Sequence, residues 1–109
     1  MAEIIGQFEQ AVLVALVRLR DDAYGRAILN EVQERLERNV SAGAVYATLE
    51  RLEGKGLATS TLAPGTAIRG GQARRYFAPT ASGVRALNDA KSASDALWHG
   101  LRWPLKVRT

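Results

Sequence analysis

The stretch SAGAVYATLERLEGKGL, residues 41–57 of this 109-residue chain, decides the fold. Ser41 is a good N-cap, because its hydroxyl can accept a hydrogen bond from an unpaired backbone N–H of the first helical turn. A glycine pair at positions 54 and 56 ends the pattern. Between these signals, apolar residues recur at steps of four and three, namely Val45, Leu49 and Leu52. The stretch therefore predicts a helix of about thirteen residues.

Two amphipathic helices are predicted before this stretch. From Gln7 to Arg20, two apolar rows indicate two neighbours, so one row should pack on the same domain and the other on a second subunit. Asp21 and Asp22 then break the pattern and are expected to cap a second helix, from about Ala23 to Arg38. The apolar rows of the first helix are Phe8, Val12, Leu16 and Leu19, and Leu13 with Val17. The inner face of the second would hold Ile28, Leu29, Val32 and Leu36.

A hairpin and a last helix are predicted after the stretch. LATSTL (57–62) and ARRYFAP (73–79) have strand composition, and the loop between them is rich in glycine. Thr80 would cap a helix that begins at Ala81, runs to about residue 103 and ends at Pro104. The chain is thus expected to be mostly α with a small β-hairpin. Its order is that of a winged helix-turn-helix followed by a C-terminal dimerisation helix over 81–103.

The composition is that of one globular domain, taken as residues 1–109. Hydrophobic residues make up 47% and charged residues 24%, which excludes a disordered chain. Cysteine is absent and His99 is the only histidine, so neither a catalytic triad nor a metal site of His or Cys ligands can form within one subunit. No glycine motif for phosphate binding occurs. We therefore expect no enzyme activity, no cofactor and no metal.

The opening sequence, MAEIIGQFEQ, has no basic region and no cleavage site of a secretion signal. The longest apolar run, Ala11 to Val17, is far shorter than the roughly 20 residues that a membrane span needs. A cytoplasmic protein is therefore expected.

Positive charge is concentrated in the second half of the chain. The formal net charge is +4. Residues 1–60 hold seven Arg or Lys against nine Asp or Glu, whereas residues 61–109 hold eight against two. A polyanion is the natural partner for such a surface, because neutralising phosphates releases condensed counterions. A basic surface that only keeps the protein soluble is an equally open interpretation.

The outward side of the 41–57 helix would carry mostly small residues, which permits close approach to another surface. The first turns of a recognition helix reach base edges in the DNA major groove, and a helix N-terminus can also face a phosphate. Two alternatives stay open, that Ser41 serves only as a cap and that Tyr46 packs partly in the core. The candidate DNA contacts here are Ser41, Gly43, Ala44 and Tyr46.

The hairpin supplies a second set of candidate DNA contacts, which combines the positive charge of arginines with glycines that leave the backbone free to approach a phosphate or the minor groove. Arg74 and Arg75 are adjacent in a strand, so their side chains should point to opposite faces and only one should meet DNA fully. Tyr24 could donate a hydrogen bond to a phosphate, or its ring could pack on the hairpin. The hairpin set is Arg69, Gly70, Gly71, Arg74 and Arg75.

Three motifs in order resemble the PadR family of bacterial transcriptional regulators along nearly the whole chain. They are YGRAILNEV (24–32), SAGAVYATLERLEGKGL (41–57) and GGQARRYFAPTASGVRAL (70–87). The resemblance, to the short class of the family, implies a winged helix, a dimerisation helix, and a homodimer that represses a promoter and can be released by a small molecule. Ala44 and Ala47 stand where many members have Thr and Pro, which removes a candidate hydroxyl contact at position 44.

The first and last helices are expected to form the dimer interface. Trp98 lies beside the apolar residues of the last helix, where its indole could simply fill the interface. Alternatively, two Trp98 rings could stack on a planar aromatic effector. The interface residues expected are Phe8, Val12, Leu13, Leu16, Leu97, Trp98 and Leu101.

Two functions of different class remain. The first is a homodimeric, sequence-specific DNA-binding repressor that a small-molecule effector could release from DNA. The second is a winged-helix module for protein association without specific DNA binding.

Overall fold

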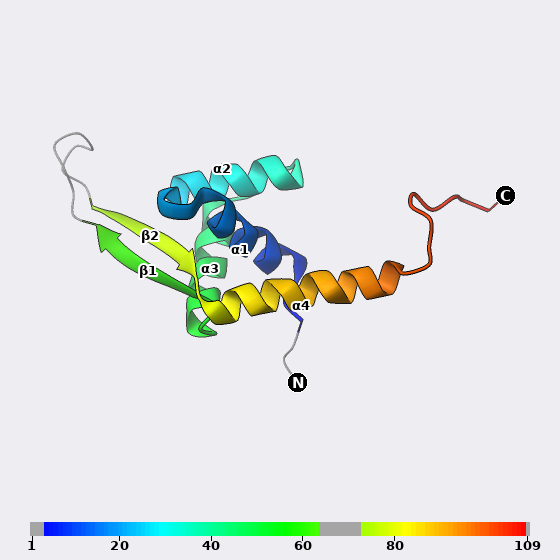
Figure 1. Ribbon diagram of the computed structural model, residues 1–109. Helices are drawn as coiled ribbons and strands as arrows, with labels where there is room; N and C mark the ends of the chain where they lie inside the picture. Colours follow the sequence, from blue (N-terminus) through cyan, green and yellow to red (C-terminus); the bar gives the residue numbers. More distant parts are fainter. Residues whose placement is uncertain (1–3, 64–72, 109) are drawn as a thin grey trace.

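The computed structural model describes residues 4–63 and 73–108 (Figure 1). Three helices pack together, a two-stranded antiparallel hairpin extends away from them, and a long fourth helix passes beneath (Figure 1). This arrangement confirms the predicted mostly helical winged fold. The elements are α1 (Gln7–Leu19), a 3-10 turn (Arg20–Asp22), α2 (Gly25–Leu36), α3 (Ala42–Gly54), β1 (Ala58–Ala63), β2 (Arg74–Pro79) and α4 (Ala81–Trp98).

One hydrophobic core joins all these helices. The inward stripes predicted for α2 and α3 are confirmed, because Ile28 and Val32 are buried with Val45, Leu49 and Leu52. Phe77 of β2 and Ala90 of α4 close the same core. The stripe spacing therefore gave the correct inward face of both short helices.

The interface predicted on α1 is wrong for three of its residues. Val12 and Leu13 are fully buried and Leu16 is 1% exposed within a single subunit, so they have no surface left for a partner. The reason is that α1 is the central helix, in contact with α2, α3, α4 and β2. The elements that pack against α1 belong to the same chain and leave Val12, Leu13 and Leu16 buried without a second subunit. Phe8 is half-buried against the same core.

The hairpin is tied to the helical body by its second strand. β1 and β2 pair in a register from Ala58 opposite Pro79 to Ala63 opposite Arg74. The backbone N–H of Phe77 donates to the carbonyl of Ala23 at 2.8 Å, and Tyr24 forms an isolated bridge with Tyr76. We call the hairpin formed by β1 and β2 the wing. These contacts hold the base of the wing against the segment before α2.

Two predicted helix boundaries are corrected. Asp21 and Asp22 lie in the 3-10 turn and do not cap α2, whose N-cap is Tyr24, without a side-chain hydrogen bond. The last helix ends at Trp98 and not near residue 103, because Gly100 adopts a left-handed φ of 80° just after it. Leu101 therefore lies beyond the helix.

The start of α4 is locked onto the turn between α3 and β1. As predicted, Thr80 caps the helix, its hydroxyl accepting from the Gly83 N–H at 3.0 Å. The same hydroxyl donates to the Gly56 carbonyl at 2.7 Å. A side chain at Gly83 would collide with the carbonyl of Leu57.

The second half of α4 extends away from the three packed helices (Figure 1). Among the described residues, no helix has the length and apolar character to cross a membrane.

Candidate nucleic-acid interface

The first turn of α3 presents small side chains to the outside. The Ser41 hydroxyl accepts a hydrogen bond from the Ala44 N–H at 3.0 Å, so its predicted role as a cap is confirmed. Gly43, Ala44 and Ala47 are exposed, as the pattern predicted. With no long side chain among these three, the helix backbone can come close to a flat or grooved surface.

Tyr46 leans from α3 across the start of α2. Its side chain is 51% exposed, which argues against the interpretation that it packs in the core. A Cβ on Gly25 would overlap the hydroxyl and ring of Tyr46. Glycine at position 25 therefore leaves the space in which the Tyr46 ring lies.

Tyr24 joins α2 to the wing. Its ring meets that of Tyr76 edge to face, with 5.9 Å between centroids and an interplanar angle of 66°. The guanidinium carbon of Arg74 lies 4.0 Å from the centroid of the Tyr24 ring, a cation–π contact. The ring of Tyr24 thus packs on the hairpin, as one of the two predictions had it, and it holds Arg74 in place.

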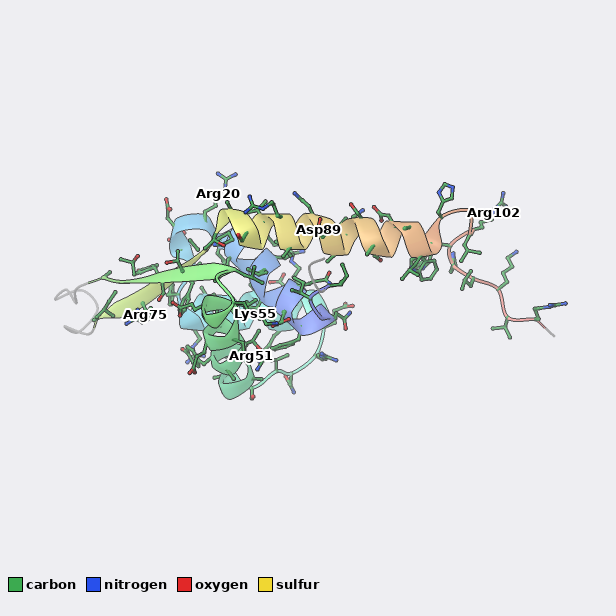
Figure 2. The ribbon with its side chains drawn as sticks, turned by 90° about the horizontal axis from the view of Figure 1, so that it is seen from below. Arg20, Arg51, Lys55, Arg75, Asp89 and Arg102 are labelled. Carbon is green, nitrogen blue, oxygen red and sulfur yellow. The ribbon has the colours of Figure 1, made fainter. Side chains whose placement is uncertain are left out.

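Arg74 and Arg75 have different partners, as expected for adjacent residues of a strand, whose side chains alternate between its two faces. Arg75 donates through Nη1 to the Ser60 hydroxyl at 3.0 Å, and that hydroxyl donates to the Glu53 carboxylate at 2.8 Å. Arg75 remains exposed on the wing (Figure 2). One arginine is therefore held by an aromatic ring and the other by a hydroxyl of the neighbouring strand.

A surface hollow of 510 Å³ brings these groups together from three parts of the sequence. The described residues that line it include three arginines, Arg26, Arg74 and Arg75, and no acidic residue. Tyr24 and Tyr46 add hydroxyl groups to the wall. We call this site the α2–wing hollow. Guanidinium and hydroxyl donors in a hollow whose described lining holds no carboxylate favour an anion such as a phosphate.

The structure distributes the predicted contacts as follows. Tyr24, Tyr46, Arg74 and Arg75 meet at the α2–wing hollow, whereas Ser41, Gly43 and Ala44 continue along α3 without lining it. Arg69, Gly70 and Gly71 lie outside the described residues. Arg26 was missed, although a cation in the first turn of a helix, two residues after a candidate contact, was a signal that could have drawn attention to it.

Arg51 belongs to another face of α3. The structure places its guanidinium in a salt bridge. Its Nε lies 4.0 Å from the Glu9 carboxylate, and its Nη2 donates to the Thr48 hydroxyl at 3.0 Å. Lys55, on the same side of α3 (Figure 2), donates to Glu9 at 2.9 Å. That hydrogen bond lowers the pKa of Glu9 below its ordinary value of 4.5, against the opposing effect of burial.

The chain is similar to known regulators over most of its length. A model of the transcriptional regulator PadR-like family matches residues 12–89. A PadR family transcriptional regulator from Eggerthella lenta is 28% identical with a TM-score of 0.65, over 83% of this chain and 76% of that one. A PadR family transcription regulator from Clostridium difficile is 26% identical with a TM-score of 0.69, over 84% of this chain and 91% of that one.

A third solved structure, a PadR-like transcriptional regulator from Bacillus cereus, is 22% identical with a TM-score of 0.66 over 82% of each chain, and shows the likeness of fold. A comparison with curated proteins gives no match.

Proposed function

Because the chain belongs to the PadR-like family of transcriptional regulators, we propose that it binds operator DNA as a homodimer, in a sequence-specific way, and represses transcription. The observation that carries this proposal is the α2–wing hollow, where three arginines gather without an acidic lining residue among those described. In this proposal the hollow takes a backbone phosphate, and α3 enters the adjacent major groove.

The contacts divide by role. Arg26, Arg74 and the Tyr24 hydroxyl are assigned to phosphates, which position the protein but do not read sequence. Arg75, which is bonded to the Ser60 hydroxyl, is assigned to the rim of the same contact. Tyr46 is the one exposed side chain near the start of α3 that combines reach with a hydrogen-bonding group, so it is assigned to a base edge. The remaining predicted contacts keep their proposed roles, Ser41, Gly43 and Ala44 along the groove and Arg69, Gly70 and Gly71 in the wing loop.

The exposed half of α4 supports the proposed homodimer. Its packed half turns Gly83, Leu87 and Ala90 toward the core, and steps of three and four residues along the same stripe lead to Leu97. Leu97 is 79% exposed, and Trp98 and Leu101 beside it are 44% and 55% exposed. An exposed apolar stripe of this kind is typical of an interaction surface, which supports a second copy as its partner. Two copies would place their α3 helices on successive major grooves, about 34 Å apart.

The proposed effector is a planar aromatic compound held between the two Trp98 rings. The exposed indole of Trp98 on the unpartnered half of α4 supports this site. Titration of tryptophan fluorescence with planar aromatic compounds, alongside operator affinity, tests it. Unchanged fluorescence and unchanged affinity would remove the effector from the proposal.

Salt-dependent DNA binding tests the main proposal. Fluorescence anisotropy is measured on a duplex from the region upstream of the protein's own gene and on a scrambled duplex of equal length. Replacing both Arg74 and Arg75 by alanine should weaken binding to both duplexes and reduce the slope of log affinity against log salt by about 1 to 2. Tyr46→Ala should weaken binding to the first duplex more than to the scrambled one.

The matched control is Lys91→Ala. It removes one exposed cation from α4, away from the wing, where Lys91 pairs with Asp95 at 2.7 Å. This control should bind like the wild type. Equal affinity of the wild type and the double arginine variant would reject the phosphate role and favour the second candidate, a protein-association module that uses the exposed stripe of α4.

A further inference from the structure

The segment after α4, Leu101–Arg108, alternates apolar and basic residues, and we call it the arm. Its odd positions are apolar, and three of its even positions are basic. Six of the eleven large hydrophobic residues that the described chain exposes lie between 97 and 107. The arm's own four are Leu101, Trp103, Leu105 and Val107, exposed by 55% to 90%.

The arm makes few contacts with its own subunit. Figure 1 shows it leading away from the body beyond the end of α4. Its cations, Arg102, Lys106 and Arg108, have no Asp or Glu oxygen within 4.0 Å among the residues that the structure describes. The arm thus exposes both apolar and basic side chains to water, which indicates a surface that binds a partner.

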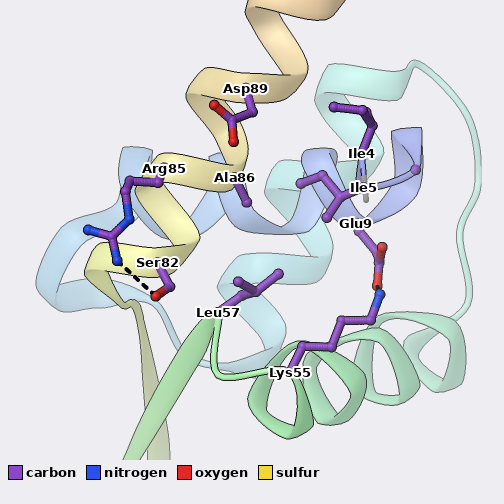
Figure 3. Close-up of a pocket in the computed structure, with 10 residues that line it drawn as sticks. Ile4, Ile5, Glu9, Lys55, Leu57, Ser82, Arg85, Ala86 and Asp89 are labelled. Atoms are coloured by element: carbon purple, nitrogen blue, oxygen red, sulfur yellow. Dashed lines mark hydrogen bonds and ion pairs between the residues drawn. The ribbon is translucent and has the colours of Figure 1, made fainter. Parts of the chain in front are cut away.

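A hollow with complementary chemistry lies at the other end of α4. It measures 650 Å³ and lies between the start of α1, the end of α3 and the first half of α4 (Figure 3). We call it the α1–α4 hollow. Its apolar lining is formed by Ile4, Ile5, Leu57 and Ala86.

The charges of the α1–α4 hollow leave one carboxylate open to a cation. Glu9 is already bonded to Lys55, and Arg85 turns aside to the Ser82 hydroxyl at 3.1 Å (Figure 3). Asp89 also lines the hollow, and within the described ranges no Lys or Arg nitrogen approaches its carboxylate to 4.0 Å. Asp89 can therefore accept one of the arm's cations while the apolar edge covers the isoleucines.

We propose that the arm of one copy docks in the α1–α4 hollow of a second copy. The proposal rests on the homodimer proposed above and names a contact within it. A twofold dimer is self-complementary, so two antiparallel α4 helices would bring the residues after Trp98 of one copy beside the residues near Asp89 of the other. The reach is sufficient, because eight extended residues span up to about 26 Å and an 18-residue helix is about 27 Å long.

Disulfide trapping tests the docking directly, since the chain has no cysteine of its own. An Ala86→Cys variant and a Leu105→Cys variant are mixed and mildly oxidised. A covalent dimer that contains one chain of each kind is expected, and neither variant alone should cross-link efficiently. Thr59→Cys, exposed on the wing, replaces Ala86→Cys as the matched control and should give no dimer with Leu105→Cys.

Tryptophan quenching gives a second readout. In a Trp98→Phe variant, Trp103, which is 76% exposed in one copy, is the only tryptophan. Its quenching by acrylamide should decrease as the protein concentration rises and dimers form. Protection that appears only with duplex DNA, or only with vesicles of anionic lipid, would assign the arm to that surface and overturn the proposal.

The outcomes separate the arm from the dimer. If the protein sediments as a dimer but the mixed Ala86→Cys and Leu105→Cys variants do not cross-link, the docking is overturned and the proposed function stands. A chain carrying both cysteines that links only to itself shows the arm folded onto its own hollow, which also overturns it. A protein that sediments as a single chain, with and without DNA, overturns both.

Discussion

At the residue scale, the position of the Tyr46 side chain requires a glycine at position 25. The Tyr46 hydroxyl and ring occupy the place where a side chain at position 25 would begin. Because Tyr46 is exposed and can rotate, Gly25→Ala should fold normally but displace the ring from the α2–wing hollow. We expect operator affinity to fall on the order of tenfold, or about 1.4 kcal/mol, measured by anisotropy.

The control for Gly25→Ala is Gly54→Ala. A Cβ at Gly54, in the last turn of α3, meets no atom within 4 Å. This variant should bind DNA like the wild type. If Gly25→Ala bound DNA with wild-type affinity, the position of Tyr46 would not matter for recognition.

Glu9 is the second residue whose role is sharply defined. It is 9% exposed, and its carboxylate accepts a hydrogen bond from Lys55. Since its pKa is lowered in the folded state, the ionised carboxylate adds stability that is present above pH 4.5 and lost as the pH falls through the lowered pKa. Glu9→Gln should therefore lower the free energy of unfolding at pH 7 by about 1 kcal/mol.

Urea unfolding at several pH values checks this prediction. The gap between wild type and Glu9→Gln should be constant from pH 7 to pH 5 and should close in more acidic solution. A gap that stayed the same down to pH 3 would show that the stabilisation does not come from the ionised carboxylate.

At the scale of elements, the N-terminus of α3 combines a cap with a proposed DNA contact. Ser41→Ala removes the hydroxyl that accepts from the Ala44 N–H and should cost about 1 kcal/mol of stability. Ser41→Asp keeps a good cap but places a negative charge where a phosphate is proposed to approach. It should therefore unfold in urea like the wild type and bind DNA more weakly than Ser41→Ala.

The two measurements must be made on the same samples. Wild-type DNA affinity of Ser41→Asp, together with wild-type stability, would mean that Ser41 is a cap and nothing else. That outcome would move the recognition surface away from the start of α3.

Local signals explain which elements could be predicted. The bounds of α3 and the start of α4 follow from Ser41 and Thr80, whose hydroxyls cap the helices that they precede. The packing of α1 could not be read this way, because periodicity gives the number of apolar rows and not which chain covers them. The end of α4 was mispredicted because the sequence pattern places the end signal at Pro104, whereas the left-handed backbone of Gly100 follows the last helical turn.

The sequence predicted most of the residues of the candidate site, but not the contacts between them. Tyr24, Tyr46 and Arg74 each stood out by residue type and place in the pattern. That Arg74 lies over the Tyr24 ring, and that Tyr46 fills the space beside Gly25, depends on how β2 docks against α2. Such contacts between distant segments have no signature in residue spacing.

At the scale of the whole molecule, the wing and the arm extend from opposite ends of the body (Figure 1). This shape fits the proposal that the chain binds DNA at one end and a second copy at the other. Leu97→Asp should keep the fold, because the side chain is 79% exposed, but weaken self-association at least tenfold. Sedimentation and circular dichroism check the two halves of this prediction.

The matched control is Ser92→Asp, which adds the same charge on the opposite side of α4. It should self-associate like the wild type. Equal association of Leu97→Asp and the wild type would remove α4 from the dimer interface.

Chemical-shift mapping of the backbone amides, with unlabelled operator duplex added to the ¹⁵N-labelled protein, tests the proposed DNA surface most directly. The largest changes should fall on three segments, residues 24–26, 41–47 and 74–76, while α4 beyond Lys91 stays unchanged. Changes confined to α4 and the arm, with none at the α2–wing hollow, would contradict the account.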